Sequence, residues 1–151
     1  MLRMPVVLTA VALLVTPAGA STREVLNEFG FFGEWAADCS RPVAMDNPYR
    51  NAYLDERGEP VFSETLGPDL PANTYAIVDA RPAKSGKAGL QLSVRLNNDV
   101  TQSLLMVRNG DQIRTMMNRR LSDGALLVKD GIVVSIGKAT PSLARCGDPR
   151  R

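Results

Sequence analysis

The sequence predicts an all-β fold, in which a small antiparallel meander closes into a barrel of about eight strands behind a short N-terminal helix or turn. Three observations support this prediction. Apolar and polar residues alternate in short runs, turn dipeptides separate the runs, and the two cysteines of the chain, Cys39 and Cys146, stand near the two ends of the predicted domain. An alternation with a period of two is typical of strands that have one buried face.

Residues 1–20 have the three parts of a secretory signal, namely the charged Arg3, the apolar run 5–15 and the small residues 18–20. We therefore predict that this signal peptide is cleaved and that residues 21–151 form a single β-barrel domain. The apolar run is too short to span a bilayer as a helix, so no membrane span is expected. The predicted location is periplasmic or secreted, in a bacterium.

The first half of the predicted domain is irregular. Residues 25–32 are expected to form a short helix or a 3₁₀ turn that leads into a strand at residues 34–38. The next segment, residues 41–51, contains Pro42 and Pro48 and is predicted to be a loop. Weaker strand patterns then follow at residues 52–56, 61–66 and 75–80, and residues 84–87 are expected to form a turn.

The second half is a regular meander. The clearest strand is residues 90–96, in which four aliphatic residues alternate with polar ones, and two further strands are predicted at residues 100–108 and 112–121. The strongest hairpin signal joins residues 126–128 to residues 132–136 through Asp130-Gly131, a dipeptide suited to turns that need positive φ angles.

Two cysteines in an exported chain predict one disulfide, Cys39–Cys146. Such a bond requires the two Cα atoms to lie within about 7 Å of each other. The first strand and the C-terminal segment would then be neighbours, which favours a closed barrel over a sandwich.

The start of the first strand resembles that of lipocalin-like barrels. Gly33-Glu34-Trp35 matches their Gly-x-Trp motif, in which a basic residue of the last strand packs over the tryptophan. The resemblance implies that Arg145 takes this role and that Gly33, Trp35 and Arg145 are structural residues. We also expect Trp35 to close one end of the barrel.

A closer resemblance covers most of the predicted domain and is to small exported proteins of Gram-negative bacteria that have no assigned activity. It implies export, the disulfide and the β fold, and no activity. The matching stretches are residues 33–40 (GEWAADCS), 47–49 (NPY), 128–131 (VKDG), 140–141 (TP) and 145–146 (RC).

Several chemistries are excluded by composition. The chain has no histidine, which removes the imidazole bases and ligands of many enzymes and metal sites. A disulfide would remove the only thiols, so no catalytic residue, metal or cofactor is predicted. The densest carboxylate cluster is interpreted as a solvated loop, with a carboxylate-based enzyme as a remote alternative; it comprises Asp55, Glu56, Glu59 and Glu64. After removal of residues 1–20 the chain has 17 basic and 16 acidic residues, a net charge of +1, which gives no global field for nucleic acid or for an anionic membrane.

Binding is therefore the predicted function. A barrel could hold a small apolar or anionic ligand, and Arg95, Arg114 and Arg119 are the candidate ligand-binding residues because arginines on neighbouring strands can converge on an anion. The alternative is a filled barrel that binds a protein partner through an exposed apolar patch, as an inhibitor or an envelope stress protein.

Overall fold

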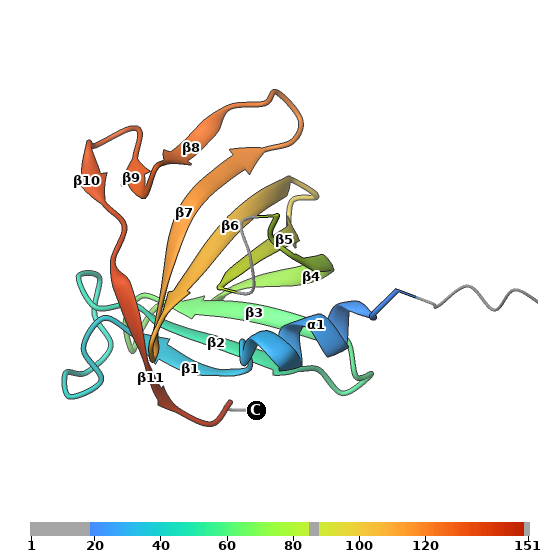
Figure 1. The fold of residues 1–151 in the computed structure, drawn as a ribbon. Coiled ribbons are helices and arrows are strands. Elements are labelled where there is room, and N and C mark those ends of the chain that lie inside the picture. The colour runs from blue at the N-terminus through green and yellow to red at the C-terminus, as the bar shows by residue number, and fades with distance from the viewer. Residues whose placement is uncertain (1–18, 85–87, 150–151) are drawn as a thin grey trace, which may run out of the picture.

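The computed structural model describes residues 19–84 and 88–149 (Figure 1). Most of the predicted signal peptide and of the turn at residues 84–87 lies outside this part of the chain. The elements are helix α1 (Thr22–Phe29) and strands β1 (Gly33–Ala36), β2 (Tyr49–Leu54), β3 (Pro60–Thr65), β4 (Asn73–Pro82), β5 (Gly89–Leu96), β6 (Thr101–Asn109), β7 (Gln112–Arg120), β8 (Leu126–Lys129), β9 (Ile132–Val133), β10 (Lys138–Ala139) and β11 (Ser142–Gly147).

Eight of these strands form a closed antiparallel barrel, which confirms the predicted fold class. Strands β1 to β7 pair in chain order, and β11 returns to lie between β7 and β1. The ladder of β11 on β7 covers only the first residues of β7, where Leu143 is opposite Ile113. The later part of β7 pairs with β8 instead, through Asn118 and Val128. The barrel wall is thus shared between β11 at one end and β8 at the other.

The disulfide Cys39–Cys146 is present, with the two Cα atoms 5.3 Å apart. It joins the segment just after β1 to β11, the strand that pairs with β1. The prediction that the first and last strands of the barrel are neighbours is therefore confirmed. Closure leaves no edge on the eight barrel strands, which is how antiparallel sheets avoid unpaired backbone groups.

Strands β8, β9 and β10, residues 126–139, form a small three-stranded flap at one end of the barrel (Figure 1). Asp130 and Gly131 have φ angles of 52° and 73°, so the predicted hairpin with a positive-φ turn is confirmed. The predicted strand at residues 132–136 is too long, however. It ends at Val133, whose carbonyl accepts hydrogen bonds from the amides of Ile136 and Gly137, and the chain turns there into β10.

Helix α1 begins three residues before the predicted segment and covers the opposite end of the barrel (Figure 1). Ser21 caps it, because its hydroxyl accepts a hydrogen bond from the Glu24 amide while the Glu24 carboxylate accepts one from the Ser21 amide. Gly30 ends the helix in the left-handed conformation, with φ 69°. The apolar face of the helix buries Val25 and Leu26 in the barrel core.

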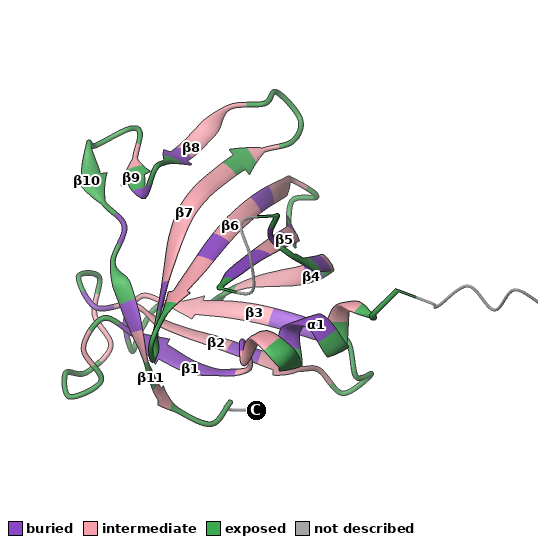
Figure 2. Ribbon diagram, viewed as in Figure 1, coloured by how far each residue is buried: buried purple, intermediate pink, exposed green. Residues whose placement is uncertain are grey.

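The core therefore lies at the helix end of the barrel, where the buried residues of the strands gather (Figure 2). Trp35 is only 1% exposed, and its indole Nε1 donates a hydrogen bond of 2.9 Å to the carbonyl oxygen of Phe31. Trp35, which the sequence predicts to close one end of the barrel, is part of the buried core. It pairs across the strands with Arg145 of β11.

The cation above the indole is not the predicted one. Arg108 of β6 lies over both Phe29 and Trp35, with its guanidinium carbon 5.1 Å and 5.9 Å from the ring centroids. Its Nη2 also donates to the carbonyl oxygen of Gly30. Arg145 instead lies over Gly33, where a Cβ atom would come within 2.8 Å of the Arg145 Nε. Gly33 is thus structural because a larger residue would displace this guanidinium.

Candidate ligand-binding cavity

The half of the barrel toward the flap is not filled. It contains a cavity of about 230 Å³ that is bounded by β2 to β8 and by the flap. The lining residues are Phe31, Arg50, Phe62, Glu64, Tyr75, Leu92, Val94, Gln102, Leu104, Met106, Thr115, Asn118, Val128, Val133, Thr140 and Pro141. The volume lies below the range of roughly 300–1,000 Å³ that is usual for drug-sized ligands, so the site suits a smaller molecule or part of a larger one.

Most of the wall is apolar. Leu92 and Met106 are almost fully buried and separate the cavity from the core, while Phe62 and Tyr75 form an aromatic side with ring centroids 5.8 Å apart. These residues face inward because they alternate with outward residues along their strands. An apolar molecule bound in this space would lose its contact with water everywhere except at the mouth. This removal of apolar surface from water is the main source of affinity for such sites.

An ion pair stands in the same wall. Arg50 of β2 and Glu64 of β3 are directly opposite each other in the ladder, and the Arg50 Nε donates to the Glu64 Oε1 over 2.9 Å. Their side chains are only 21% and 19% exposed. Within the described residues no other hydrogen bond involves either side chain, which leaves the Arg50 Nη atoms and the Glu64 Oε2 available to a bound molecule.

Tyr75 adds a hydroxyl to this pair. Burial raises the pKa of the Tyr75 phenol, and the nearby Glu64 carboxylate raises it further, whereas the Arg50 guanidinium opposes the change. The phenol therefore stays neutral through the physiological range and can donate a hydrogen bond. Arg50, Glu64 and Tyr75 together form a polar corner of the cavity with both donors and an acceptor.

A second polar group lies on the wall formed by β6 and β7. The Asn118 Nδ2 donates to the Gln102 Oε1 over 2.9 Å, but the Asn118 Oδ1 is buried and has no hydrogen-bond partner. A buried acceptor without a partner costs free energy, which a water or a ligand donor in the cavity would recover.

The predicted ligand-binding arginines do not line this cavity. Arg95 and Arg119 are exposed on the outer surface of their strands. Arg114 is engaged with the flap: its Nη2 donates to the carbonyl oxygen of Gly131 over 2.8 Å and its Nε donates to the Thr140 hydroxyl over 3.1 Å. The arginine that does line the cavity is Arg50, within a segment predicted to be a loop.

The carboxylate cluster that a carboxylate-based enzyme would need is not assembled. The Asp55 carboxylate accepts hydrogen bonds from the amides of Arg57 and Glu59 and so closes the turn between β2 and β3. Glu64 lies apart from that turn, in the cavity and paired with Arg50. Within the described ranges no group of three metal-binding side chains is found, and both cysteines are in the disulfide.

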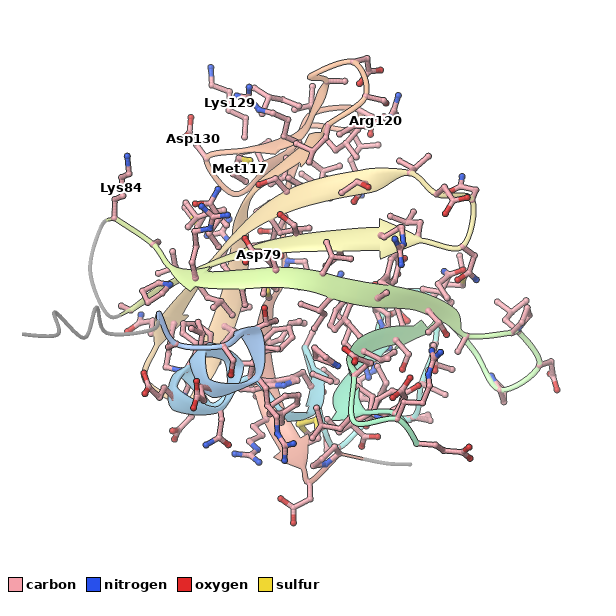
Figure 3. The ribbon with its side chains drawn as sticks, turned by 90° about the vertical axis from the view of Figure 1, so that its right-hand side faces the viewer. Asp79, Lys84, Met117, Arg120, Lys129 and Asp130 are labelled. Carbon is pink, nitrogen blue, oxygen red and sulfur yellow. A yellow bond between two sulfur atoms is a disulfide. The ribbon has the colours of Figure 1, made fainter. Side chains whose placement is uncertain are left out.

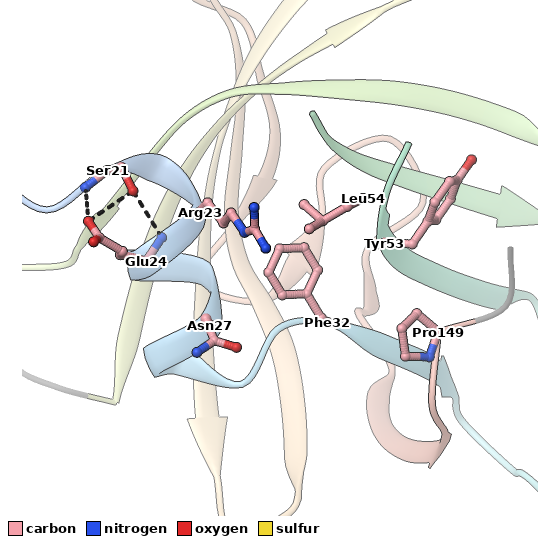
Figure 4. Close-up of a pocket in the computed structure, with 8 residues that line it drawn as sticks. All are labelled: Ser21, Arg23, Glu24, Asn27, Phe32, Tyr53, Leu54 and Pro149. Carbon is pink, nitrogen blue, oxygen red and sulfur yellow. Dashed lines mark hydrogen bonds between the residues drawn. The ribbon is translucent and has the colours of Figure 1, made fainter. Parts of the chain in front are cut away.

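A second, more open hollow lies beside the N-terminus of α1 (Figure 4). It is a cleft of about 600 Å³ between the helix, the end of β2 and Pro149. Its acidic group, Glu24, is already used by the Ser21 cap, and the hydrogen bond from the Ser21 amide lowers the Glu24 pKa. The barrel cavity is therefore the better candidate, since its polar groups are largely buried and keep hydrogen-bonding capacity.

No protein-family model, curated protein or solved structure matches this chain. Among the residues that the structure describes, no helix is both long enough and apolar enough to cross a membrane.

Proposed function

We propose that this protein binds a small molecule with an apolar body and one polar group in the cavity of its barrel, and that it acts by binding rather than by turnover. The observation that supports this most is a partly enclosed cavity with apolar walls and a polar corner at Arg50, Glu64 and Tyr75. An apolar wall supplies affinity and a few fixed polar groups supply orientation.

The chemistry of the polar corner restricts the class of ligand that can bind there. Arg50 and Glu64 neutralise each other, so a strongly charged ligand would have to compete with their ion pair. A hydroxyl or another neutral polar group suits the corner best, because the Arg50 Nη atoms and the Tyr75 hydroxyl can donate while Glu64 can accept. The apolar part of such a ligand would lie against Leu92, Leu104 and Met106.

The site of action is proposed to be the periplasm or the exterior of a bacterium. This rests on the signal-like residues 1–20 and on the disulfide, since disulfides persist in oxidising compartments.

Thermal unfolding of the protein with a panel of fatty acids, small organic acids and hydroxylated apolar compounds tests the proposal. A ligand at 100 times its Kd should stabilise the native state by about 2.7 kcal/mol, which corresponds to a Tm increase of several degrees. Leu104→Trp fills the cavity and should abolish the shift. Leu105→Trp is the matched control, because the next residue faces the other side of β6 and does not line the cavity.

A shift that persists in Leu104→Trp would place the ligand elsewhere. Absence of any shift, together with a turnover activity that is lost on removal of the Glu64 carboxylate, would replace the binding proposal with an enzyme.

A binding surface for a protein partner remains the second candidate. The flap supports it, since Ile132, Val134 and Ile136 are exposed aliphatic residues within five positions of one another.

A further inference from the structure

The flap combines exposed aliphatic residues with basic ones. Val134 and Ile136 are 55% and 63% exposed in the turn between β9 and β10, and Ile132 precedes them on β9. In the isolated molecule these large aliphatic side chains stay in contact with water, which is unfavourable. Their exposure therefore indicates a partner that covers them.

The basic residues stand next to these side chains in the ladder. Lys129 of β8 is directly opposite Ile132 on the face of the flap away from the cavity, whereas Lys138 of β10 is opposite the cavity-lining Val133, on the other face. Arg119 of β7 is opposite Leu126 at the start of the flap. All three are exposed, and within the described ranges none of them forms an ion pair, whereas the neighbouring Arg120 is paired with Asp123.

The flap residues 126–139 carry Lys129, Lys138 and the acid Asp130, a charge of +1, and Arg119 of the adjoining β7 raises the local charge to +2. Figure 3 shows Lys129, Asp130 and Arg120 together at the flap end of the molecule, with Lys84 on a separate loop. Positive charge around an aliphatic tip is complementary to an anionic lipid surface, where phosphates lie directly above hydrocarbon.

We propose that the flap docks on an anionic lipid surface, with Val134 and Ile136 entering the headgroup region and Lys129 and Arg119 contacting the phosphates. A protein partner is the weaker interpretation, because stable protein interfaces use about 20–30 residues on each side and this surface offers a handful. Shallow insertion of a few aliphatic residues, assisted by basic ones, is sufficient for reversible binding to a bilayer.

Docking would also bring the bilayer close to the cavity. Val128 and Val133 are on the same two strands of the flap and line the cavity wall. Besides the ladder between β7 and β8, Gly131 joins the flap to β7, since its amide donates to the carbonyl oxygen of Met116 and its own carbonyl oxygen accepts from the Arg114 Nη2. Lipid docking itself does not depend on cavity binding and is tested separately from it.

The test is flotation of the secreted, processed protein with vesicles of phosphatidylglycerol and phosphatidylcholine, against vesicles of phosphatidylcholine alone. We expect binding to the anionic vesicles that weakens as salt rises. Lys129→Gln should weaken it about fivefold, the effect of one basic residue near the surface, and Lys84→Gln on its separate loop should leave it unchanged.

The aliphatic tip has its own matched pair. Val134→Asn should reduce binding to the anionic vesicles, whereas Val78→Asn should not, because Val78 is 46% exposed on β4, outside the flap. Leu104→Trp should keep vesicle binding even though it fills the cavity, which separates a failure of this proposal from a failure of cavity binding.

Equal binding to neutral and anionic vesicles, no binding to either, or equal losses in a flap variant and its control would overturn the proposal. If the protein does not bind vesicles but self-associates in analytical ultracentrifugation, and Val134→Asn abolishes the self-association, the flap binds a second copy of the chain instead.

Discussion

Removal of the disulfide should destabilise the barrel strongly, because the bond closes a long loop. Cys39 and Cys146 are separated by 107 positions. In the chain-entropy model a closed loop of this length restricts the unfolded chain by about 5 kcal/mol at 25 °C. This is a large share of the roughly 5–15 kcal/mol net stability of a typical domain. The double variant Cys39→Ser/Cys146→Ser should lose most of that amount.

Urea unfolding followed by the fluorescence of Trp35 measures the loss, since the buried indole becomes exposed on unfolding. Each single variant, Cys39→Ser or Cys146→Ser, should lose about as much as the double variant, because either change removes the same bond. A double variant within about 1 kcal/mol of the parent protein would contradict the entropic reasoning, and so would single variants whose losses add.

Three further predictions concern the core, the flap and the cavity. Trp35→Ala should cost about 3–5 kcal/mol in urea unfolding, the range for emptying a large buried aromatic site; a loss below 1 kcal/mol would contradict the packing. Gly131→Ala should destabilise the protein more than Gly137→Ala. Both residues have positive φ, but of the two only Gly131 would place a Cβ close to a side chain, 2.8 Å from the Arg114 Nη2. Equal losses of unfolding free energy in urea would refute this. The raised pKa of Tyr75 implies a contribution to the free energy of unfolding that is complete below the ordinary tyrosine pKa of about 10 and is lost as pH rises through the folded-state pKa. Glu64→Gln should lower the pKa of Tyr75 in an ultraviolet titration. An unchanged pKa would count against the proximity of Tyr75 and Glu64.

The strands and turns of the second half could be predicted because alternation and turn dipeptides act locally. Residues 90–96 form β5 with one additional residue, and Asp130-Gly131 adopts the positive φ angles that its composition favours. Closure of the barrel was also predictable, since the disulfide requires its two ends to meet. The length of the last hairpin was not, because residues 134–136 have strand-forming side chains that nothing in the barrel covers.

The orientation of the arginines was within reach of the sequence. Leu92, Val94 and Leu96 face the interior, so the same alternation that predicts β5 places Arg95 outside. Ile113 is buried, which likewise turns its neighbour Arg114 away from the cavity. Charge alone indicates Arg95, Arg114 and Arg119 as ligand-binding residues, whereas position in the alternation decides which face of the sheet they occupy.

Arg50 was missed because Pro48 made its segment look like a loop. The structure starts β2 at Tyr49, two residues after the buried Asn47, whose side chain accepts from the Asp38 amide and donates to the Asp38 carbonyl. These bonds hold the segment before β2 against the segment after β1, and in the ladder of β1 and β2 Arg50 is opposite Trp35, on the same face of the sheet. A side chain that pairs with a distant backbone has no local sequence pattern, so this register could be found only in three dimensions.

Native mass spectrometry of the protein purified gently from its own source tests cavity binding most directly. We expect a small-molecule adduct on the intact parent protein and on Leu105→Trp, and no adduct on Leu104→Trp, in which the cavity is filled. A parent protein without any adduct that also gains no stability from the ligand panel would contradict a binding role for the barrel, as would an adduct that Leu104→Trp retains.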